Sequence, residues 1–326
     1  MMKFDEELLD PEIRNISGLG KILPYIYSRR GCKLFNKILK LSLVGKCVNK
    51  DLAYEQRWIR RKDGSKLRIC IYRPSETKTD VPGLLWIHGG GYAIGAPELD
   101  EVFIQKFIEK SHCVVVTPDY RCSVDEPYPA ALEDCYTALL WMKHNADKLG
   151  IRSNQLFVGG DSAGGGLTAA LSLYARDRET VNIAFQIPLY PMIDDRMNTE
   201  SAMNNYAPVW NSKLNYKGWK YYLAEDFMTS KVSKYAAPAR ETDYSNLPPT
   251  CTFVGYLEPF RDETIKYIEN LKAAGVDTYF QVYDRCYHGF DQLSPESKVA
   301  KEATEFLMNT FMYAVENYFA DQPSAK

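Results

Sequence analysis

One short stretch of the sequence carries a residue type and spacing suited to nucleophilic catalysis. The stretch "GGDSAGG" places Ser162 in a G-x-S-x-G pattern, with a strand-like run leading into it and a helix-like run leading out. A nucleophile on a sharp strand-to-helix turn needs small neighbours, because its backbone is strained and its flanks are crowded. Such a turn lifts the hydroxyl to a helix N-terminus, where developing negative charge is stabilised. This context favours a nucleophilic serine over an ordinary glycine-rich turn.

A second stretch, "HGGG" at 88–91, ends the strand-like run "GLLWI". Consecutive glycines are entropically costly, which indicates that the backbone approaches something closely. Taken alone, the stretch fits a flexible turn equally well. Together with the serine motif, it leads us to predict an oxyanion hole formed by the amides of Gly90, Gly91 and Ala163. His88 precedes the turn, and we expect it to make structural hydrogen bonds rather than to act as a base.

A serine hydroxyl needs a base, and the pKa of histidine suits that task near neutral pH. The chain has four histidines. His112 lies between a helix-like and a strand-like run, and His144 lies within a helical pattern. Neither position belongs at the carboxyl edge of a sheet. His288 follows the last strand-like run, so it is the predicted general base.

The acid that would orient this histidine is expected in "GYLEPFRDE" at 255–263. Glu258 directly follows a strand-like run, on the same predicted edge as the serine. Asp262 opens a helical pattern and is explained as its N-cap, while Glu263 falls in the first turn, where an acid suits the helix dipole. We therefore favour Glu258 over Asp262 on the basis of its position. A glutamate can serve as the triad acid, because a triad needs only a carboxylate that orients and stabilises the imidazolium.

The elements that must position these residues follow from the hydrophobic pattern. The stretch "RWIRRKDGSKLRICIYRP" predicts two strands joined by a hairpin turn. Further strands are predicted at "GLLWIHGG", "CVVVTPDY", "QLFVGGDS", "FQIPLYP", "TCTFVGYLE" and "TYFQVYDR", with helical patterns between or after them. Near-continuous apolar strands separated by helices predict an α/β fold, with a mostly parallel central sheet flanked by helices on both faces.

Residues 195–240 break this alternation. They are polar and aromatic, and they form too long a stretch for a plain loop. We expect this insertion to carry helices of its own and, with an N-terminal contribution from residues 1–50, to cap a catalytic domain spanning 51–326. Most of its aromatic residues are expected to form the core of the cap: Tyr206, Trp210, Tyr216, Trp219, Tyr221 and Tyr222.

Residues 21–50 contain eight Lys or Arg residues and no acid. Leu34, Ile38 and Leu41 recur there at helical spacing. A basic amphipathic helix can lie on a membrane. We favour a helix that packs over a core with its lysines in solvent, because basic helical patterns are weak evidence for membrane binding.

The bulk composition excludes several classes of protein. The chain of 326 residues has a net charge of −2, so no overall field favours nucleic acid. No apolar run approaches the about 18 residues of a membrane span. The acidic start "MMKFDEELLD" is unlike a secretory signal, so we predict a cytoplasmic protein without stable membrane insertion. The eight scattered cysteines favour reduced thiols over disulfides, and neither a cofactor nor a metal is expected.

The motifs "HGGGY", "PDYR…EPYPAALED", "GGDSAGG", "LYPMID", "LEPFRDE" and "YHGF" together resemble the α/β-hydrolases of the hormone-sensitive-lipase type, close to bacterial acetyl esterases. The resemblance covers the chain from about Trp58 to the C-terminus. It implies an α/β-hydrolase fold with Ser162 as nucleophile and His288 as base, the predicted oxyanion hole, and the triad acid in "LEPFRDE".

The sequence departs from the usual family pattern in two places. "CSVD" at 122–125 replaces the usual Leu-Ala-Pro, which bears on loop packing. Glu258 with Pro259 stands where Asp-Pro is usual, and glutamate is one methylene longer than aspartate.

We therefore expect a serine carboxylesterase that hydrolyses short-chain, acetyl-like esters of small molecules through an acyl-enzyme intermediate. The aromatic cap and the lack of an exposed apolar stretch suited to a lipid interface favour acetyl to butyryl groups.

Alternatives are a related amidase, peptidase or lipase, although peptidases of this fold usually carry a large extra domain for which this chain has no room. A non-catalytic receptor is disfavoured because plant receptors of this family lack the histidine retained at His288. The family often forms dimers, which leaves a homodimer open.

Overall fold

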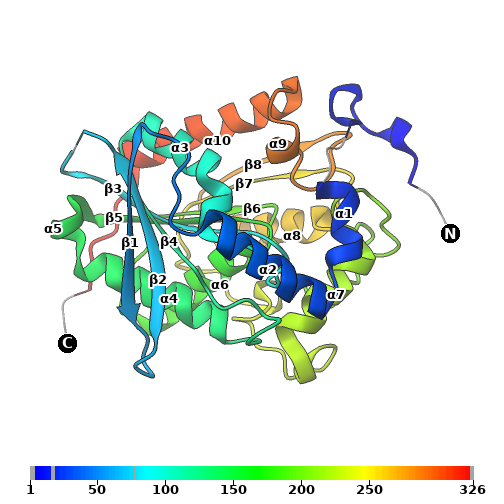
Figure 1. Ribbon diagram of the computed structural model, residues 1–326, viewed down its shortest axis with the longest axis horizontal. Helices are drawn as coiled ribbons and strands as arrows, with labels where there is room; N and C mark the ends of the chain where they lie inside the picture. The colour runs from blue at the N-terminus through cyan, green and yellow to red at the C-terminus, as the bar shows by residue number, and fades with distance from the viewer. Residues whose placement is uncertain (1–3, 16–18, 77, 324–326) are drawn as a thin grey trace.

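An eight-stranded sheet runs through the centre of the molecule (Figure 1). The computed structural model describes residues 4–15, 19–76 and 78–323. The strand order is β1-β2-β4-β3-β5-β6-β7-β8, with β2 antiparallel to both of its neighbours and the other pairs parallel. The predicted fold class, a mostly parallel sheet flanked by helices, is confirmed.

Every expected strand is present. The strands are β1 (Leu52–Arg60), β2 (Lys66–Pro74), β3 (Val81–Ile87), β4 (Val114–Pro118), β5 (Ile151–Asp161), β6 (Phe185–Leu189), β7 (Thr250–Gly255) and β8 (Thr278–Tyr283). The hairpin begins earlier than its predicted start near Trp58. Strands β3, β4, β6 and β7 are buried along their whole length, which explains their continuous apolar sequences.

Helices cover both faces of this sheet, as Figure 1 shows. The helices are α1 (Leu19–Ile26), α2 (Arg29–Leu43), α3 (Glu101–Ser111), α4 (Ala130–His144), α5 (Ala146–Leu149), α6 (Ala163–Arg178), α7 (Ser212–Leu223), α8 (Arg261–Ala273), α9 (Phe290–Leu293) and α10 (Lys298–Asn317). Short 3₁₀ turns are η1 (Glu6–Leu8), η2 (Pro11–Ile13), η3 (Pro97–Asp100), η4 (Ala224–Asp226) and η5 (Pro238–Arg240). Helices α3 and α10 contribute to the core on one face, and α4 and α6 to the core on the other.

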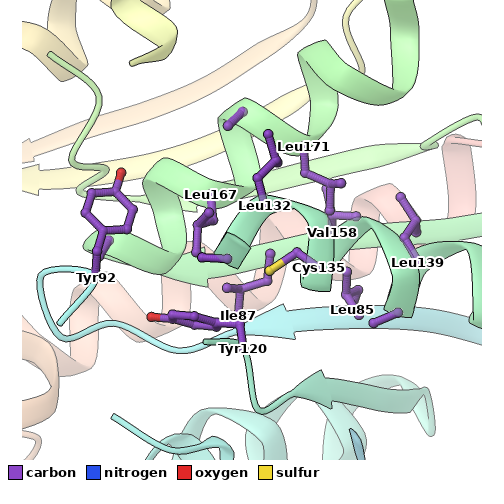
Figure 2. Close-up of a cluster of buried hydrophobic side chains, with 14 of the residues drawn as sticks. Leu85, Ile87, Tyr92, Tyr120, Leu132, Cys135, Leu139, Val158, Leu167 and Leu171 are labelled. Atoms are coloured by element: carbon purple, nitrogen blue, oxygen red, sulfur yellow. The ribbon is translucent and has the colours of Figure 1, made fainter. Parts of the chain in front are cut away.

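The sheet separates the two cores, because successive side chains of a strand point to opposite faces of the sheet. In β3, Leu85 and Ile87 belong to the core that includes α4 and α6, whereas Leu84 and Trp86 belong to the core that includes α3 and α10. Figure 2 shows the first of these cores, where side chains of α4 and α6 meet those of β3 and β5. This packing fixes α6 against the sheet, and α6 directly follows the candidate nucleophile.

The insertion at 195–240 contains α7, η4 and η5, and it lies against the N-terminal helices (Figure 1). The Tyr27 ring packs edge-on against Trp210 at 5.1 Å, and Lys217 Nζ donates to the Tyr27 carbonyl oxygen at 3.1 Å. Tyr222 stacks on Tyr92 at 3.8 Å, outside the insertion. The contacts of Tyr27 link the two segments that we expect to form the cap, and the contact of Tyr222 joins the insertion to the body of the protein.

The predicted aromatic core of the insertion is only partly present. Trp210, Trp219 and Tyr222 are buried, whereas Tyr206 and Tyr216 are exposed. The buried members pack partly against the body of the protein, so their burial depends on tertiary contacts that periodicity does not reveal.

Helix α2 packs on the protein through a face other than the one that its sequence pattern indicates. Its buried residues include Cys32, Leu39 and Asn36, and the Asn36 amide donates to the Ala93 carbonyl oxygen at 3.0 Å. In contrast, the helical stripe Leu34, Ile38 and Leu41 is 60%, 53% and 77% exposed. The expectation that no apolar stretch is exposed was therefore wrong.

All eight cysteines are free, and all but the half-buried Cys47 are buried. This agrees with the prediction of reduced thiols packed in the interior. None of the helices in the described ranges is long and apolar enough to cross a bilayer.

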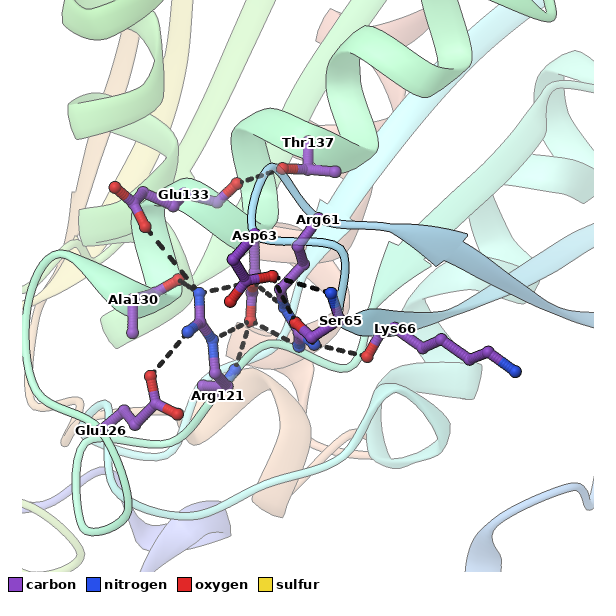
Figure 3. A network of polar contacts seen from close by, with 10 residues as sticks. Arg61, Asp63, Ser65, Lys66, Arg121, Glu126, Ala130, Glu133 and Thr137 are labelled. Atoms are coloured by element: carbon purple, nitrogen blue, oxygen red, sulfur yellow. Dashed lines mark hydrogen bonds and ion pairs between the residues drawn. The ribbon is translucent and has the colours of Figure 1, made fainter.

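Polar contacts of Arg61 and Arg121, seen in Figure 3, hold the loop in which "CSVD" departs from the family pattern. Asp134 of α4 accepts hydrogen bonds from the Arg121 guanidinium at 3.0 Å and from the Arg121 backbone N–H at 2.9 Å. It also accepts from Arg61 Nε, at the end of the β1–β2 hairpin. Glu126 binds the outer side of Arg121 at 2.6 Å, where it is 55% exposed. One carboxylate thus connects the hairpin, the loop and α4.

We predict that Asp134→Asn lowers the free energy of unfolding by about 3 kcal/mol, because it leaves two guanidinium groups without their buried counter-charge. The matched control is Glu126→Gln, which removes an exposed partner of the same arginine and should cost less than about 1 kcal/mol. Chemical denaturation of both variants measures the difference. Equal losses would show that Asp134 is not the anchor of this loop.

Candidate active site

Ser162 sits on the tight turn between β5 and α6, as the sequence pattern predicts. Its backbone has φ of 55° and ψ of −116°, a strained conformation for a residue with a side chain. Neighbouring hydrogen bonds hold this conformation. The Ser162 N–H donates to the Leu189 carbonyl oxygen at 3.0 Å, and its own carbonyl oxygen accepts from the Met192 and Gly166 N–H groups at 3.0 and 2.9 Å. The turn is thus fixed by β6 and by the segment that follows it.

The small residues of the serine motif are explained by close packing. A Cβ atom on Gly164 would lie 1.9 Å from the Ile87 carbonyl oxygen, at the end of β3. Any side chain at this position would force α6 away from the sheet. The glycine therefore lets α6 begin in direct contact with the end of β3, immediately after Ser162.

Ser162, His288 and Glu258 form one hydrogen-bonded chain. His288 Nε2 lies 2.8 Å from Ser162 Oγ, and its Nδ1 makes a short hydrogen bond with Glu258 Oε2. The other carboxylate oxygen of Glu258 accepts from the Gly255 N–H at 2.9 Å. All three side chains are buried, and Glu258 is 0% exposed. The structure therefore brings together the serine, the base and the acid favoured from the sequence.

Aromatic rings surround the imidazole of His288. Tyr190 and Phe260 each approach it edge-on with ring centroids 5.0 Å away, and Trp210 lies at 6.4 Å. These rings restrict the orientation of the imidazole. These rings were not predicted to belong to the site, although "LYPMID", "LEPFRDE" and the aromatic insertion contain them.

The glycine turn after β3 presents backbone amides to the same cavity. Gly90 has φ of +110°, and a Cβ atom there would lie 1.9 Å from the Ile94 carbonyl oxygen, so glycine is required. In the part of the chain that the structure describes, the Gly90 and Gly91 N–H groups donate to no protein acceptor. Ala163 is the first residue of α6, where an N–H has no partner within the helix. Gly90 and Gly91 line the cavity beside Ser162, and Ala163 directly follows Ser162 in the chain; the oxyanion hole formed by these three amides stays a prediction.

His88 takes the structural position expected of it. Its ring is buried, stacks on Tyr120 at 4.2 Å, and Nδ1 lies 2.8 Å from the Gly89 carbonyl oxygen. Burial lowers the pKa of His88, which keeps the imidazole neutral.

The expected role of Asp262 as an N-cap was wrong. Helix α8 begins at Arg261 with Phe260 at the N-cap position, which places Asp262 inside the first turn. Its carboxylate accepts from the Ser201 N–H at 2.8 Å and from Arg261 Nε at 2.7 Å. Asp262 therefore ties the insertion to α8, a long-range role that the local pattern does not reveal.

Glu263 lies in the first turn of α8, as expected, and its carboxyl group is buried. It accepts from the Ile193 and Asp194 N–H groups at 2.8 and 3.2 Å. Burial raises the pKa of Glu263 well above its usual value. This residue holds the segment after β6, which in turn positions the Ser162 backbone.

A second group of buried carboxyl groups lies beside the serine and was not found from the sequence. Asp161 accepts from Gln292 Nε2 at 3.0 Å, and Asp100 accepts from Trp86 Nε1 at 2.8 Å. Burial raises the pKa of both aspartates and raises that of Asp291 to about 7. Sequence proximity to Ser162 and His288 was the one signal that could have indicated Asp161 and Asp291.

Ser162 and His288 open into a cavity of about 270 Å³. Its apolar walls come from both N-terminal helices, the segment after β3, η3, the insertion and α9: Leu23, Phe35, Ile94, Leu99, Val209, Trp210 and Leu293. Among the described residues, no group of three or more His, Cys, Asp or Glu side chains is arranged to hold a metal ion. Ser162, His288 and the two glycines Gly90 and Gly91 thus face one small cavity with largely apolar walls.

Comparisons with known proteins agree with this geometry. Residues 84–292 match a family model described as the alpha/beta hydrolase fold. The chain is 29% identical to carboxylesterase NlhH of Mycobacterium tuberculosis, over 78% of this chain and 80% of that protein. It is 30% identical to an arylesterase of Saccharolobus solfataricus, over 83% and 88% of the two chains. The structure of a bacterial heroin esterase superimposes with a TM-score of 0.85 at 32% identity, covering 95% of this chain and 98% of that one.

We predict that Glu258→Gln lowers kcat for a chromogenic acetyl ester by about 10³–10⁴-fold, because an amide cannot stabilise the imidazolium and can hold the wrong tautomer. Asp262→Asn is the matched control. It keeps an oxygen for the Ser201 N–H and should leave kcat/KM largely unchanged.

Melting curves of both variants exclude unfolding as the cause of a lost activity. If Asp262→Asn loses activity and Glu258→Gln retains it, the roles of the two acids must be exchanged.

Proposed function

We propose that this chain, which belongs to the α/β-hydrolase family of the hormone-sensitive-lipase type, is a serine esterase. Its relatives show that it is a carboxylic ester hydrolase. The proposed reaction is the hydrolysis of short-chain, acetyl-like esters through an acyl-enzyme. The observation that carries this proposal is the hydrogen-bonded chain from Ser162 through His288 to Glu258 at a small apolar cavity. The names of the relatives, carboxylesterase and arylesterase, support the same class of substrate.

In the proposed acylation step, Ser162 Oγ attacks the ester carbonyl carbon while His288 Nε2 accepts the hydroxyl proton. The 2.8 Å separation of these atoms suits direct proton transfer. The tetrahedral intermediate collapses, the bond to the alcohol oxygen breaks, and His288 returns its proton to that oxygen. The alcohol leaves, and the acyl group remains on Ser162.

In the proposed deacylation step, His288 takes a proton from water, whose oxygen attacks the acyl carbon. Collapse of the second intermediate releases the carboxylic acid and restores the Ser162 hydroxyl. Glu258 stabilises the imidazolium in both steps and keeps Nδ1 protonated in the resting state. Its buried position, with a second hydrogen bond from the Gly255 N–H, fixes the carboxylate for this role.

Negative charge on the carbonyl oxygen is proposed to be stabilised by the Gly90, Gly91 and Ala163 amides. Such preorganised donors are worth about 10²–10³ in kcat each where one has been removed. The two glycines and Ser162 line the same cavity, which supports convergence of these donors on one oxygen.

We further propose that residues 1–50 and about 195–240 act together as a cap over a catalytic domain spanning 51–326. Support comes from the contacts of Tyr27 with Trp210 and with Lys217, and from the Tyr27 hydroxyl, which donates to the Gly91 carbonyl oxygen at 2.8 Å. The cap thereby touches the proposed oxyanion turn. The proposed partner is a small-molecule ester, while a cytoplasmic location and a homodimer remain predictions.

We predict that Ser162→Ala lowers kcat/KM for a soluble acetyl ester by at least about 10³-fold, because the hydroxyl is the attacking group. Ser172→Ala is the matched control: Ser172 is a buried serine of α6, the helix that follows Ser162, and among the described residues its hydroxyl bonds only the Thr168 carbonyl oxygen. It should retain most of the activity. Near-normal turnover by Ser162→Ala would exclude the proposed mechanism.

We predict that kcat/KM is highest for acetyl to butyryl esters and falls for longer acyl chains. The cavity of about 270 Å³ lies at the small end for a ligand pocket, and its walls include the bulky side chains of Phe35 and Trp210. A series of p-nitrophenyl esters of increasing chain length measures this dependence. A preference for long-chain esters would contradict the proposed specificity.

A further inference from the structure

Helix α2 carries a second apolar face that no other part of the described chain covers. Its inner face holds Cys32, Asn36 and Leu39 against the protein. Leu34, Ile38 and Leu41 lie on the opposite side, since positions i, i+4 and i+7 share one stripe of a helix, and all three are more than half exposed. We call this stripe the outer face of α2. A solvated helix with one buried side has no structural need for it.

The charged residues of the segment 21–50, which contains α2, are all basic. Of the chain's 40 Lys and Arg residues, eight lie between 21 and 50, while none of its 42 Asp and Glu residues does. Arg30, Lys33, Lys37 and Lys40 are exposed positions of α2. Lys33 forms a surface ion pair with Asp125 at 2.9 Å, and in the described ranges no carboxylate lies within 4 Å of the charged groups of the other three. The face is therefore apolar and basic within an otherwise acidic chain.

We propose that the outer face of α2 binds reversibly to anionic lipid surfaces. Exposed leucine and isoleucine side chains enter the interfacial region of a bilayer, and neighbouring lysines are attracted to anionic head groups. A second copy fits less well, because a two-fold dimer through this face would place one basic helix against another. Three apolar side chains give only weak insertion, so binding depends on both the apolar stripe and the charge.

The site of docking lies beside the proposed catalytic cavity. Phe35 of α2 and Leu23 of α1 contribute to the cavity walls, and α1 also exposes Ile22 and Tyr25. A lipid-bound α2 would thus bring the cavity close to esters dissolved in the bilayer surface. This consequence for the substrate rests on the proposed esterase function, whereas lipid binding itself does not.

The test measures vesicle binding by sedimentation with the Ser162→Ala protein, so that catalysis plays no part. Vesicles contain equal parts phosphatidylcholine and phosphatidylglycerol, or phosphatidylcholine alone. We expect binding to the anionic vesicles that weakens as salt is added, and little binding to the neutral ones.

Two variants separate the contributions of the outer face. Leu34→Gln with Leu41→Gln removes apolar side chains, and Lys37→Glu with Lys40→Glu reverses two charges. Each pair should reduce partitioning onto anionic vesicles by about tenfold or more. The matched control, Lys148→Glu with Lys272→Glu, makes the same charge change at exposed positions of α5 and α8 and should bind nearly as the parent does.

The same substitutions in a background with Ser162 intact should leave hydrolysis of a soluble acetyl ester unchanged, which verifies folding. Absence of vesicle binding, or equal loss in the control variant, would overturn the proposal. So would a dimer that the Leu34→Gln, Leu41→Gln pair dissociates while vesicle binding is absent. Vesicle binding by a protein that hydrolyses no ester would instead refute the proposed function and leave the docking surface standing.

Discussion

The strained backbone of Ser162 is the constraint on which the rest of the site depends. A left-handed φ at a residue with a side chain is unfavourable by about 1–3 kcal/mol and persists only where the surroundings determine it. Here the Leu189 carbonyl oxygen and the Met192 N–H hold the two ends of the Ser162 backbone. Gly164 lets α6 begin directly against the end of β3. The Ser162 backbone therefore has one conformation, and the positions of His288 and of the proposed oxyanion amides must suit it.

The segment after β6 transmits this constraint to the rest of the protein. Met192, which contacts the Ser162 carbonyl oxygen, is followed by Ile193 and Asp194, whose N–H groups bind the buried Glu263. Glu263 lies on α8, five residues after Glu258. The proposed nucleophile and the proposed triad acid are thus connected through one short run of backbone hydrogen bonds, in addition to the contact through His288.

Much of this arrangement could be predicted from the sequence, because the signals are local. Continuous apolar runs indicated the buried strands, and the glycines around Ser162 indicated a turn too crowded for side chains. Glu258 was favoured because it directly follows a strand, and parallel strands end at one edge of the sheet. What could not be predicted depends on contacts between distant segments. Asp262 looks like a helix cap in isolation, but in the fold it binds the Ser201 N–H of the insertion.

Helix α2 illustrates the same limit in another way. Its periodicity correctly indicated an amphipathic helix, yet the stripe of Leu34, Ile38 and Leu41 faces solvent, and the packed side includes the polar Asn36. Hydrophobic spacing reveals that a helix has an apolar side, but not which partner covers it. The Asn36 amide is satisfied by the Ala93 carbonyl oxygen, a contact that makes a polar residue suitable for the inner face.

The proposed mechanism requires the acyl group of the substrate to pass through Ser162. The most direct measurement is the mass of the protein after brief mixing with an activated acetyl ester and rapid acid quenching, followed by peptide mapping. We expect the transient addition of one acetyl group, located on the peptide that contains Ser162 and absent from Ser162→Ala. Turnover without any covalent adduct, or an adduct on a different residue, would contradict it.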